Sequence, residues 1–566
     1  MKRIYLLAVF MLTGLVLQAQ VQRRVFIEEA TNASCAPCAS QNPAFDALLQ
    51  ANSDKVAVVK YHWYFPGTDP MHAQNPDENN GRVAYYGING VPTAIIDGVI
   101  PSGSGFGYPG APSGFTQTLI NQYYNTPAPV EMLVYENIDT EQNLLNAYVL
   151  IHALAPVTGN LRVQTAVIEK HIHFNYAPGS NGEKDFYDVM KKMLPDQNGT
   201  QIVAMEAGDY IMLHQQWDFN GWTIYNEEEL SVVSWLQNNT SKTVYQSAIG
   251  TTEMFQPLYN TDVEIVELIN VPDKSCTPSL QPGLLLRNNG SEIVTEMEIQ
   301  YTMNNGMPAV FLWSGALAFT ETVVVSLPVI AFTLEEENLF QVSIPAVNGS
   351  DDQYMKNNNK TKTILHAVKS EDYVRLMLRT DNKPEEITWK ITNSENEVIH
   401  SGGPYTQPNQ MINTMLPFDL EDCYQFTIYD AGGDGICCEN GVGFFALSDH
   451  TNSAFVEGGN FSDSTGASFK ILKGVGMETR NDIGLKIAPN PASDRLELGF
   501  TLSKEATVRM AITDLTGRVL QQENPVSLPQ GIHAATFDVA DFPDGMYLVR
   551  IGVEDSFTIN KFLVKK

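Results

Sequence analysis

One stretch decides how the N-terminal region folds: an apolar run, Val25-Phe26-Ile27, and then the motif Cys35-Ala36-Pro37-Cys38. The run predicts a buried strand, and the apolar residues Phe45, Leu48 and Leu49 predict one face of a helix that begins at the motif. A thiol at the start of a helix faces unpaired backbone N–H groups and the positive end of the helix dipole, which lower its pKa. The motif therefore predicts a reactive first thiol and a second thiol one helical turn later.

A second signal lies further along the chain, where Gly90-Val91-Pro92-Thr93 leads into the apolar run Ala94-Ile95-Ile96. A thioredoxin-like fold has a strand in this place, which begins with a cis proline facing the thiol pair. The expected catalytic residues are Cys35 as the nucleophile, Cys38 as the resolving thiol and Pro92 as the platform on which an extended substrate pairs. These roles predict thiol–disulfide exchange with protein thiols or disulfides, so the protein is a candidate thiol–disulfide oxidoreductase.

Three other interpretations of the cysteine pair remain open. The pair can form a structural disulfide, can supply half of a zinc site with His62 and His72, or can be the vestige of an exchange site on a binding domain. With an incidental pair, the protein would be a surface adhesin or another binder of surface ligands. A hydrolase is not indicated, because the sequence shows neither a nucleophile–His–acid set nor an HExxH motif.

Composition excludes some classes of partner. The chain has 566 residues, of which 43% are hydrophobic and 18% charged, so it is long enough for several packed domains. Its formal net charge of −30 argues against nucleic acid, because the phosphates would be repelled. The same charge argues against electrostatic docking on an anionic membrane. It suits an exported protein or one that uses divalent cations.

The first residues predict export. Lys2 and Arg3 form a basic region, the apolar stretch 4–17 is short for a membrane span, and cleavage is expected after Ala19. We therefore predict a signal peptide over residues 1–19 and no transmembrane segment in the rest of the chain. Disulfides persist outside the cytoplasm, so cysteines of the mature chain can pair there.

The six cysteines are too few for a disulfide scaffold. Apart from the pair in the motif they are Cys276, Cys423, Cys437 and Cys438. Adjacent cysteines rarely bridge each other, so we predict that Cys423 pairs with Cys437 or with Cys438. The partner of Cys276 stays open.

Candidate metal ligands lie on the glycine-rich loop Asp430-Ala431-Gly432-Gly433-Asp434-Gly435, which follows a predicted strand. The carboxylates of Asp430 and Asp434 are the oxygen ligands that calcium prefers, so calcium is a candidate cofactor. The EF-hand pattern is not met, because Gly432 stands where a ligand is expected and no glutamate closes the loop. The alternative is an Asp-Gly turn stapled by a disulfide.

Short motifs follow one another near the C-terminus: Pro489-Asn490-Pro491, Asp514-Leu515-Thr516-Gly517, Pro543-Asp544-Gly545-Met546-Tyr547 and a basic Lys565-Lys566 ending. On these motifs residues 485–566 resemble the C-terminal sorting domain of the type IX (Por) secretion system. The resemblance implies a β-sandwich that binds the secretion machinery and directs export across the inner and outer membranes of a Gram-negative bacterium. It also implies a location at the cell surface or outside the cell, usually with removal of the domain.

Other motifs come from the first half of the chain: Glu28-Glu29-Ala30-Thr31, Gly90-Val91-Pro92-Thr93, Met193-Leu194-Pro195 and the predicted hairpin 231–246. On these motifs the first half resembles the outer-membrane-protein-28-like (Omp28-related) family. The resemblance implies a thioredoxin-like domain followed by an appended β-rich region.

Turn signals and hydrophobic periodicity divide the chain further and predict a multidomain α/β plus all-β protein. Within the second segment, residues 186–194 show a helical pattern that ends at Pro195. The expected organisation is a signal peptide (1–19), a thioredoxin-like domain (20–125), a β-rich region (126–257), an immunoglobulin-like β-sandwich (258–369), a β-sandwich module with an Asp/Gly/Cys loop (370–474), a linker (475–484) and the sorting domain (485–566).

Overall fold

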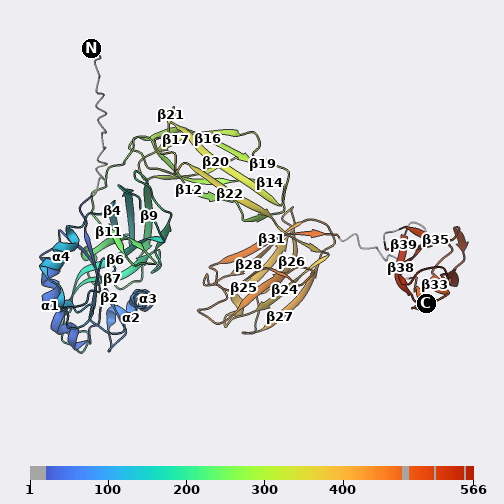
Figure 1. Cartoon of the computed structure of the whole chain (residues 1–566), viewed down its shortest axis with the longest axis horizontal. Helices are drawn as coiled ribbons and strands as arrows, with labels where there is room; N and C mark the ends of the chain where they lie inside the picture. The colour runs from blue at the N-terminus through green and yellow to red at the C-terminus, as the bar shows by residue number, and fades with distance from the viewer. Residues whose placement is uncertain (1–20, 474–482, 516–517, 554–555) are drawn as a thin grey trace, which may run out of the picture. The chain divides into compact units, whose positions relative to one another are not determined.

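The computed structural model describes residues 21–473, 483–515, 518–553 and 556–566 (Figure 1). The predicted signal peptide and residues 475–482 of the predicted linker lie outside these ranges. The chain divides into two compact units. The first holds the residues up to Asn260 together with Asn289–Ser291, and the second holds Thr261–Asn288 and Glu292–Lys566.

The first unit is built on one mixed, eight-stranded sheet. Its strands are β1 (Val25–Thr31), β2 (Val56–His62), β3 (Thr93–Ile96), β6 (Leu161–His173), β7 (Asp185–Leu194), β8 (Thr200–Ile202), β10 (Leu230–Asn238) and β11 (Val244–Ile249). Seven strands lie in the order β11-β10-β6-β7-β2-β1-β3, and β8 pairs with β6. β1 runs parallel to β2 and antiparallel to β3, and β7 runs parallel to β2.

Helices cover both faces of this sheet. They are α1 (Ala36–Gln50), α2 (Pro70–Gln74), α3 (Pro76–Tyr86) and α4 (Gln117–Tyr124), with short 3₁₀ turns at Pro112–Gly114 and Glu227–Glu229. Figure 1 shows α1 and α4 on one side and α2 and α3 on the other. Alternation along β1 explains this arrangement, because successive side chains of a strand point to opposite faces. Val25 and Ile27 pack with Phe45 of α1, whereas Phe26 stacks on Trp235 at 4.2 Å between ring centroids.

A second, antiparallel sheet completes the first unit. It consists of β4 (Val130–Asp139), β5 (Leu144–Ala153) and β9 (Tyr210–Asp218), in the order β4-β5-β9. Its buried side chains share one apolar cluster with residues of β6 and β10, such as Val163 and Val232. The boundary expected at residues 125/126 therefore falls inside one folded unit, since strands from both sides of it belong to the same large sheet.

The prediction of a helix over residues 186–194 is wrong, because this segment forms β7, which lies between β2 and β6 in the sheet. A strand that is buried on both faces does not alternate between apolar and polar residues, so its pattern resembles that of a helix. Met190 and Met193 pack into one apolar cluster, while Phe186 and Val189 pack into another.

The second unit contains three two-sheet assemblies, each around its own apolar cluster. The first spans residues 263–366 and has sheets in the orders β12-β15-β18 and β13-β22-β20-β16-β17, with β21 on β20 and the pair β14-β19. Its strands are β12 (Val263–Ile269), β13 (Lys274–Ser275), β14 (Ser279–Leu280), β15 (Gly283–Asn288), β16 (Val294–Met303), β17 (Ala309–Leu317), β18 (Thr322–Ser326), β19 (Ile330–Ala331), β20 (Glu337–Val347), β21 (Ser350–Asp351) and β22 (Asn359–His366).

The second assembly has sheets in the orders β23-β31-β28-β25-β26 and β27-β24-β29-β30. Its strands are β23 (Val368–Glu371), β24 (Tyr373–Arg379), β25 (Ile387–Thr392), β26 (Val398–Gly402), β27 (Met411–Pro417), β28 (Cys423–Asp430), β29 (Phe444–Ser448), β30 (Ala454–Gly458) and β31 (Ser464–Leu472), with a 3₁₀ turn at Pro384–Glu386.

The third assembly has sheets in the orders β32-β33-β37 and β35-β34-β38-β39, with β36 on β34. Its strands are β32 (Lys486–Ala488), β33 (Arg495–Leu502), β34 (Ala506–Thr513), β35 (Val519–Gln522), β36 (Val526–Leu528), β37 (Gly531–Asp538), β38 (Gly545–Val553) and β39 (Ser556–Val564). The prediction of a β-rich chain is thus confirmed, because the strands form several separate sheets.

The predicted disulfide pairing is wrong. Cys423 pairs with Cys276, 147 residues away, and Cys437 pairs with its neighbour Cys438. The prediction assumed that the nearest cysteines in the chain would pair. The fold instead places Cys276, next to β13, within reach of the first residue of β28, and such a contact between distant segments leaves no local signal.

Candidate functional site

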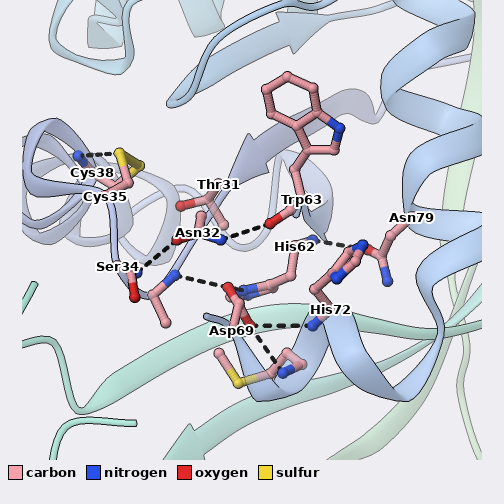
Figure 2. Close-up of polar contacts among 12 residues, drawn as sticks. Thr31, Asn32, Ser34, Cys35, Cys38, His62, Trp63, Asp69, His72 and Asn79 are labelled. Carbon is pink, nitrogen blue, oxygen red and sulfur yellow. Dashed lines mark hydrogen bonds and ion pairs between the residues drawn. A yellow bond between two sulfur atoms is a disulfide. The ribbon is translucent and has the colours of Figure 1, made fainter. Parts of the chain in front are cut away.

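The two cysteines of the motif lie at the N-terminus of α1. Cys35 immediately precedes the helix, and its Sγ accepts a hydrogen bond from the backbone N–H of Cys38 at 3.1 Å. The two sulfurs form a disulfide, so the structure describes the oxidised site (Figure 2). Cys35 is only 1% exposed and Cys38 is fully buried. The pair therefore has the favourable position at a helix N-terminus but lies beneath the surface.

The start of β3 brings Pro92 next to this pair. The Val91–Pro92 peptide bond is cis, and the carbonyl oxygen of Val91 lies 3.4 Å from Sγ of Cys35. Tyr108 anchors this turn, because its hydroxyl donates to the carbonyl oxygen of Pro92 at 2.8 Å and accepts from the side chain of Gln41 on α1 at 3.0 Å. The structure thus places the three residues predicted for the site together.

The loop of residues 63–69, which follows β2, holds the segment that leads into the motif (Figure 2). Oδ2 of Asp69 accepts from the N–H of Ala33 at 2.7 Å and lies 2.7 Å from Nδ1 of His62. Asn32 donates from its side chain to the carbonyl oxygen of Trp63 at 2.6 Å. Burial alone would raise the pKa of Asp69, but His62 and the backbone donors outweigh burial and lower that pKa. This loop is therefore anchored by a buried, charged hydrogen-bond centre.

The turn of the β6–β7 hairpin, residues 179–183, holds the same segment. The N–H of Ser180 donates to Oγ of Ser34 at 3.0 Å, and the N–H of Asn181 donates to the carbonyl oxygen of Ala33 at 3.3 Å. The side-chain amide of Asn181 donates to the carbonyl oxygen of Cys35 at 3.2 Å. The sequence analysis missed this turn. Its Asn-Gly dipeptide at 181–182 is a turn signal, but nothing local shows which distant segment the turn contacts.

Buried charges lie on the elements that carry the site. Nζ of Lys60 on β2 forms ion pairs with Glu29 of β1, at 2.8 Å, and with Asp46 of α1. Burial raises the pKa of Glu29, and Lys60 only partly opposes this effect. Burial alone would lower the pKa of Lys60, but attraction to its two carboxylates outweighs burial and raises that pKa. Two buried acids therefore share one lysine beside the helix that carries Cys38.

A pocket of about 500 Å³ lies between α1 and the loop that enters β7. Pro43 and Asp46 line it from α1, and Glu183 and Tyr187 line it from the hairpin. Burial raises the pKa of Glu183 to about 7. Burial also raises the pKa of Asp188, on β7, to about 7. These carboxyl groups therefore change their protonation near neutral pH.

The two histidines considered for zinc are engaged elsewhere. Nδ1 of His62 contacts Asp69, and Nε2 of His72 lies 3.2 Å from Oδ1 of Asn80. The two sulfurs are bonded to each other, whereas zinc binds thiolates. The donor set that a zinc site needs is therefore not gathered in this oxidised form.

The loop after β28 brings three carboxylates together. Ligand atoms of Glu386, Asp430 and Asp434 lie within 4.8 Å of one another, and among the residues that the structure describes no other group of His, Cys, Asp and Glu meets this criterion. Oδ2 of Asp430 is engaged by the N–H groups of Asp434 and Gly435, each at 3.2 Å. Asn440 donates to Oδ2 of Asp434. The remaining oxygens form a hard donor set of the kind that calcium prefers, and Glu386 is a member that the sequence analysis missed.

The proteins and structures compared with this chain are at most distantly similar to it in sequence. The chain matches no curated protein. Among solved structures, HBP35 of Porphyromonas gingivalis is 14% identical, with a TM-score of 0.34, over 61% of this chain and 98% of that one. A protein of Agrobacterium tumefaciens is 17% identical, with a TM-score of 0.29, over 42% of this chain and 98% of that one. TM-scores this low do not establish a common fold.

In the part of the chain that the structure describes, the helices are all too short or too polar to cross a membrane.

Residues 486–565 match the family model described as "Secretion system C-terminal sorting domain", which confirms the resemblance of residues 485–566 to such a domain. The C-terminal residues are therefore a type IX sorting domain, and this domain indicates secretion to the cell surface or the extracellular space.

Proposed function

We propose that this exported protein exchanges thiols and disulfides at Cys35 and Cys38, which would make it a thiol–disulfide oxidoreductase outside the cell. One observation carries the proposal: the pair lies at the N-terminus of α1, with Sγ of Cys35 only 3.4 Å from the carbonyl oxygen of Val91, beside Pro92. The N–H of Cys38, which already donates to Sγ of Cys35, would stabilise a thiolate there in the reduced form. The β1-α1-β2 connection with antiparallel β3 supports the thioredoxin-like assignment of residues 20–125.

The oxidised form accepts electrons from a dithiol. A substrate thiolate attacks Sγ of Cys35, a new S–S bond forms, and the Cys35–Cys38 bond breaks with Cys38 leaving as a thiolate. The second substrate thiol, once deprotonated, attacks the substrate sulfur of this mixed disulfide and releases Cys35 as a thiolate. The substrate becomes a disulfide. Its two electrons pass to the cysteine pair, and its two protons pass to the cysteine pair or to solvent. The reverse sequence reduces a substrate disulfide.

The Cys38→Ser variant tests this proposal. It lacks the resolving thiol, so the reduced variant should retain substrates as mixed disulfides on Cys35. The matched control is Cys35→Ser/Cys38→Ser, which has neither thiol. Capture of an unfolded model protein whose disulfides are intact by the single variant alone supports exchange. Equal capture by both variants, together with a very low reduction potential of the wild-type pair, would identify a structural disulfide in a surface adhesin or ligand-binding protein.

A second proposal concerns calcium in the β23–β31 assembly. We propose that Glu386, Asp430 and Asp434 bind one calcium ion, because the fold adds a third carboxylate to the two on the loop. Titration with CaCl2 should raise the melting temperature of the wild type, and Asp434→Asn should abolish this rise. The control is Glu395→Gln, which changes an exposed acidic residue in a turn of the same assembly. An equal rise in wild type and Asp434→Asn would contradict the proposal.

A further inference from the structure

The oxidised site presents a problem of access, because Cys35 is only 1% exposed. An attacking thiolate must reach Sγ of Cys35 directly, so part of the surrounding chain has to move before exchange can occur. Two segments hold the residues that lead into Cys35: the loop 63–69 and the hairpin turn 179–183.

These two segments are anchored with different strength. The loop 63–69 depends on Asp69, which is 4% exposed and pairs with His62, itself 1% exposed. A buried, charge-assisted hydrogen bond is roughly twice as strong as a neutral one. The hairpin turn holds the segment through neutral donors, namely two backbone N–H groups, the hydroxyl of Ser180 and the amide of Asn181. The turn therefore has the lower free energy of local opening.

The hairpin turn also packs directly on backbone. A Cβ atom added to Gly179 would lie 2.1 Å from the carbonyl oxygen of Ala33, so only glycine fits this approach. Beyond Asn181, the loop and α1 are separated by the pocket of about 500 Å³. The turn can therefore lift without displacing the body of the helix.

The side chain of Asn181 is held in place by its own neighbour. Its amide donates to Oε2 of Glu183 as well as to the carbonyl oxygens of Cys35 and Asn32, the latter at 3.4 Å. Its Oδ1 accepts from the N–H of Glu183 at 2.9 Å. These contacts fix the orientation in which the amide reaches the first residue of the motif.

We propose that the hairpin turn 179–183 is a gate over the Cys35–Cys38 disulfide, and that Asn181 is its latch. In the closed state the turn covers the segment that carries Cys35. In the open state this segment is released, and the thiolate of a dithiol substrate reaches Sγ of Cys35. The inference rests on the proposed exchange function, because it names what controls access to that same disulfide.

The test is the rate at which dithiothreitol reduces the Cys35–Cys38 bond in the oxidised full chain. The reaction converts the protein disulfide to two thiols and dithiothreitol to its cyclic disulfide, and peptide mass analysis after thiol labelling follows this one bond. Each lost hydrogen bond contributes about 1 kcal/mol, so Asn181→Ala should accelerate reduction by about five- to thirtyfold. Gly179→Ala, which pushes the turn away from Ala33, should act in the same direction. Tyr176→Ala, in the same hairpin loop at an 86% exposed position, should leave the rate unchanged.

Urea separates gate opening from general loss of stability. Local opening exposes little surface, so the reduction rates of wild type and Asn181→Ala should hardly change at low urea concentrations. Rates that rise steeply with urea, or an Asn181→Ala rate equal to that of Tyr176→Ala, would overturn the gate. The two proposals fail in distinguishable ways. If Cys38→Ser captures no substrate but Asn181→Ala is reduced faster than wild type, the exchange function alone is overturned. If Cys38→Ser captures substrate but Asn181→Ala is reduced at the wild-type rate, the gate alone is overturned.

Discussion

Two disulfides of this chain differ in their sequence separation and in their surroundings. Cys35–Cys38 joins residues 3 positions apart at the start of a helix, next to an element that carries a buried acid–lysine cluster. Cys276–Cys423 joins residues 147 positions apart and links two β-rich assemblies. A disulfide stabilises mainly by restricting the unfolded chain, and this effect grows with the length of the closed loop. The short disulfide therefore contributes little to the free energy of unfolding, whereas the long disulfide contributes much.

This difference shows that surroundings, and not the bond itself, indicate a function. The short disulfide lies near titratable side chains, the hairpin turn 179–183 and the carbonyl oxygen of Val91. The long one is placed where β28 begins, with Sγ of Cys276 3.4 Å from the carbonyl oxygen of Phe469 in the neighbouring strand β31. We therefore propose exchange for the first and stabilisation for the second.

The largest effect should come from removing the two bonds in turn. Cys276→Ser/Cys423→Ser should lower the free energy of unfolding by about 5 kcal/mol, because a loop of that length is released in the unfolded chain. Cys35→Ser/Cys38→Ser should lower it by only about 2 kcal/mol. Urea unfolding of both double variants measures the difference. Equal losses, or a larger loss at the short bond, would break the comparison.

The next effect concerns the buried charges beside the short disulfide. Lys60→Met leaves Glu29 and Asp46 without their cation, and breaking a buried ion pair from one side costs about 3–5 kcal/mol. The matched control is Lys362→Met, which removes the cation beside the exposed Asp273, and ion pairs at the surface contribute about 0–1 kcal/mol. Urea unfolding at neutral pH should separate the two variants. Similar losses of unfolding free energy in both variants would show that the buried ion pairs on β1, β2 and α1 contribute no more than a surface pair.

The smallest effect is expected for the pH dependence of the melting temperature. Burial raises the pKa of Asp188 from 3.8 to about 7, so the fold favours the protonated carboxyl. Its contribution to stability is fully present below pH 3.8 and is lost as the pH rises through about 7. Asp188→Asn should therefore reduce the fall in melting temperature between pH 5 and pH 8, as measured by calorimetry. Lys362 lowers the pKa of Asp273, so Asp273→Asn should not reduce this fall. An unchanged profile for Asp188→Asn would contradict the assignment.

Much of the candidate site could be predicted from local signals. The cysteine motif, the apolar face at Phe45 and Leu49, and the proline before an apolar run each lie within a few residues of the chain. They follow from helix and strand periodicity, which any short window contains. The sorting domain was predicted in the same way, from motifs that keep their order in the last residues.

The sequence by itself therefore determined the β-rich, exported character of the chain and which residues could form an exchange site. Only the tertiary structure decided that β7 is a strand, that Cys423 meets Cys276, and that Asn181 reaches Cys35. The physical reason is the same in each case. These contacts join segments far apart in the chain, and burial and backbone pairing between such segments depend on the whole packed unit rather than on the pattern of either segment.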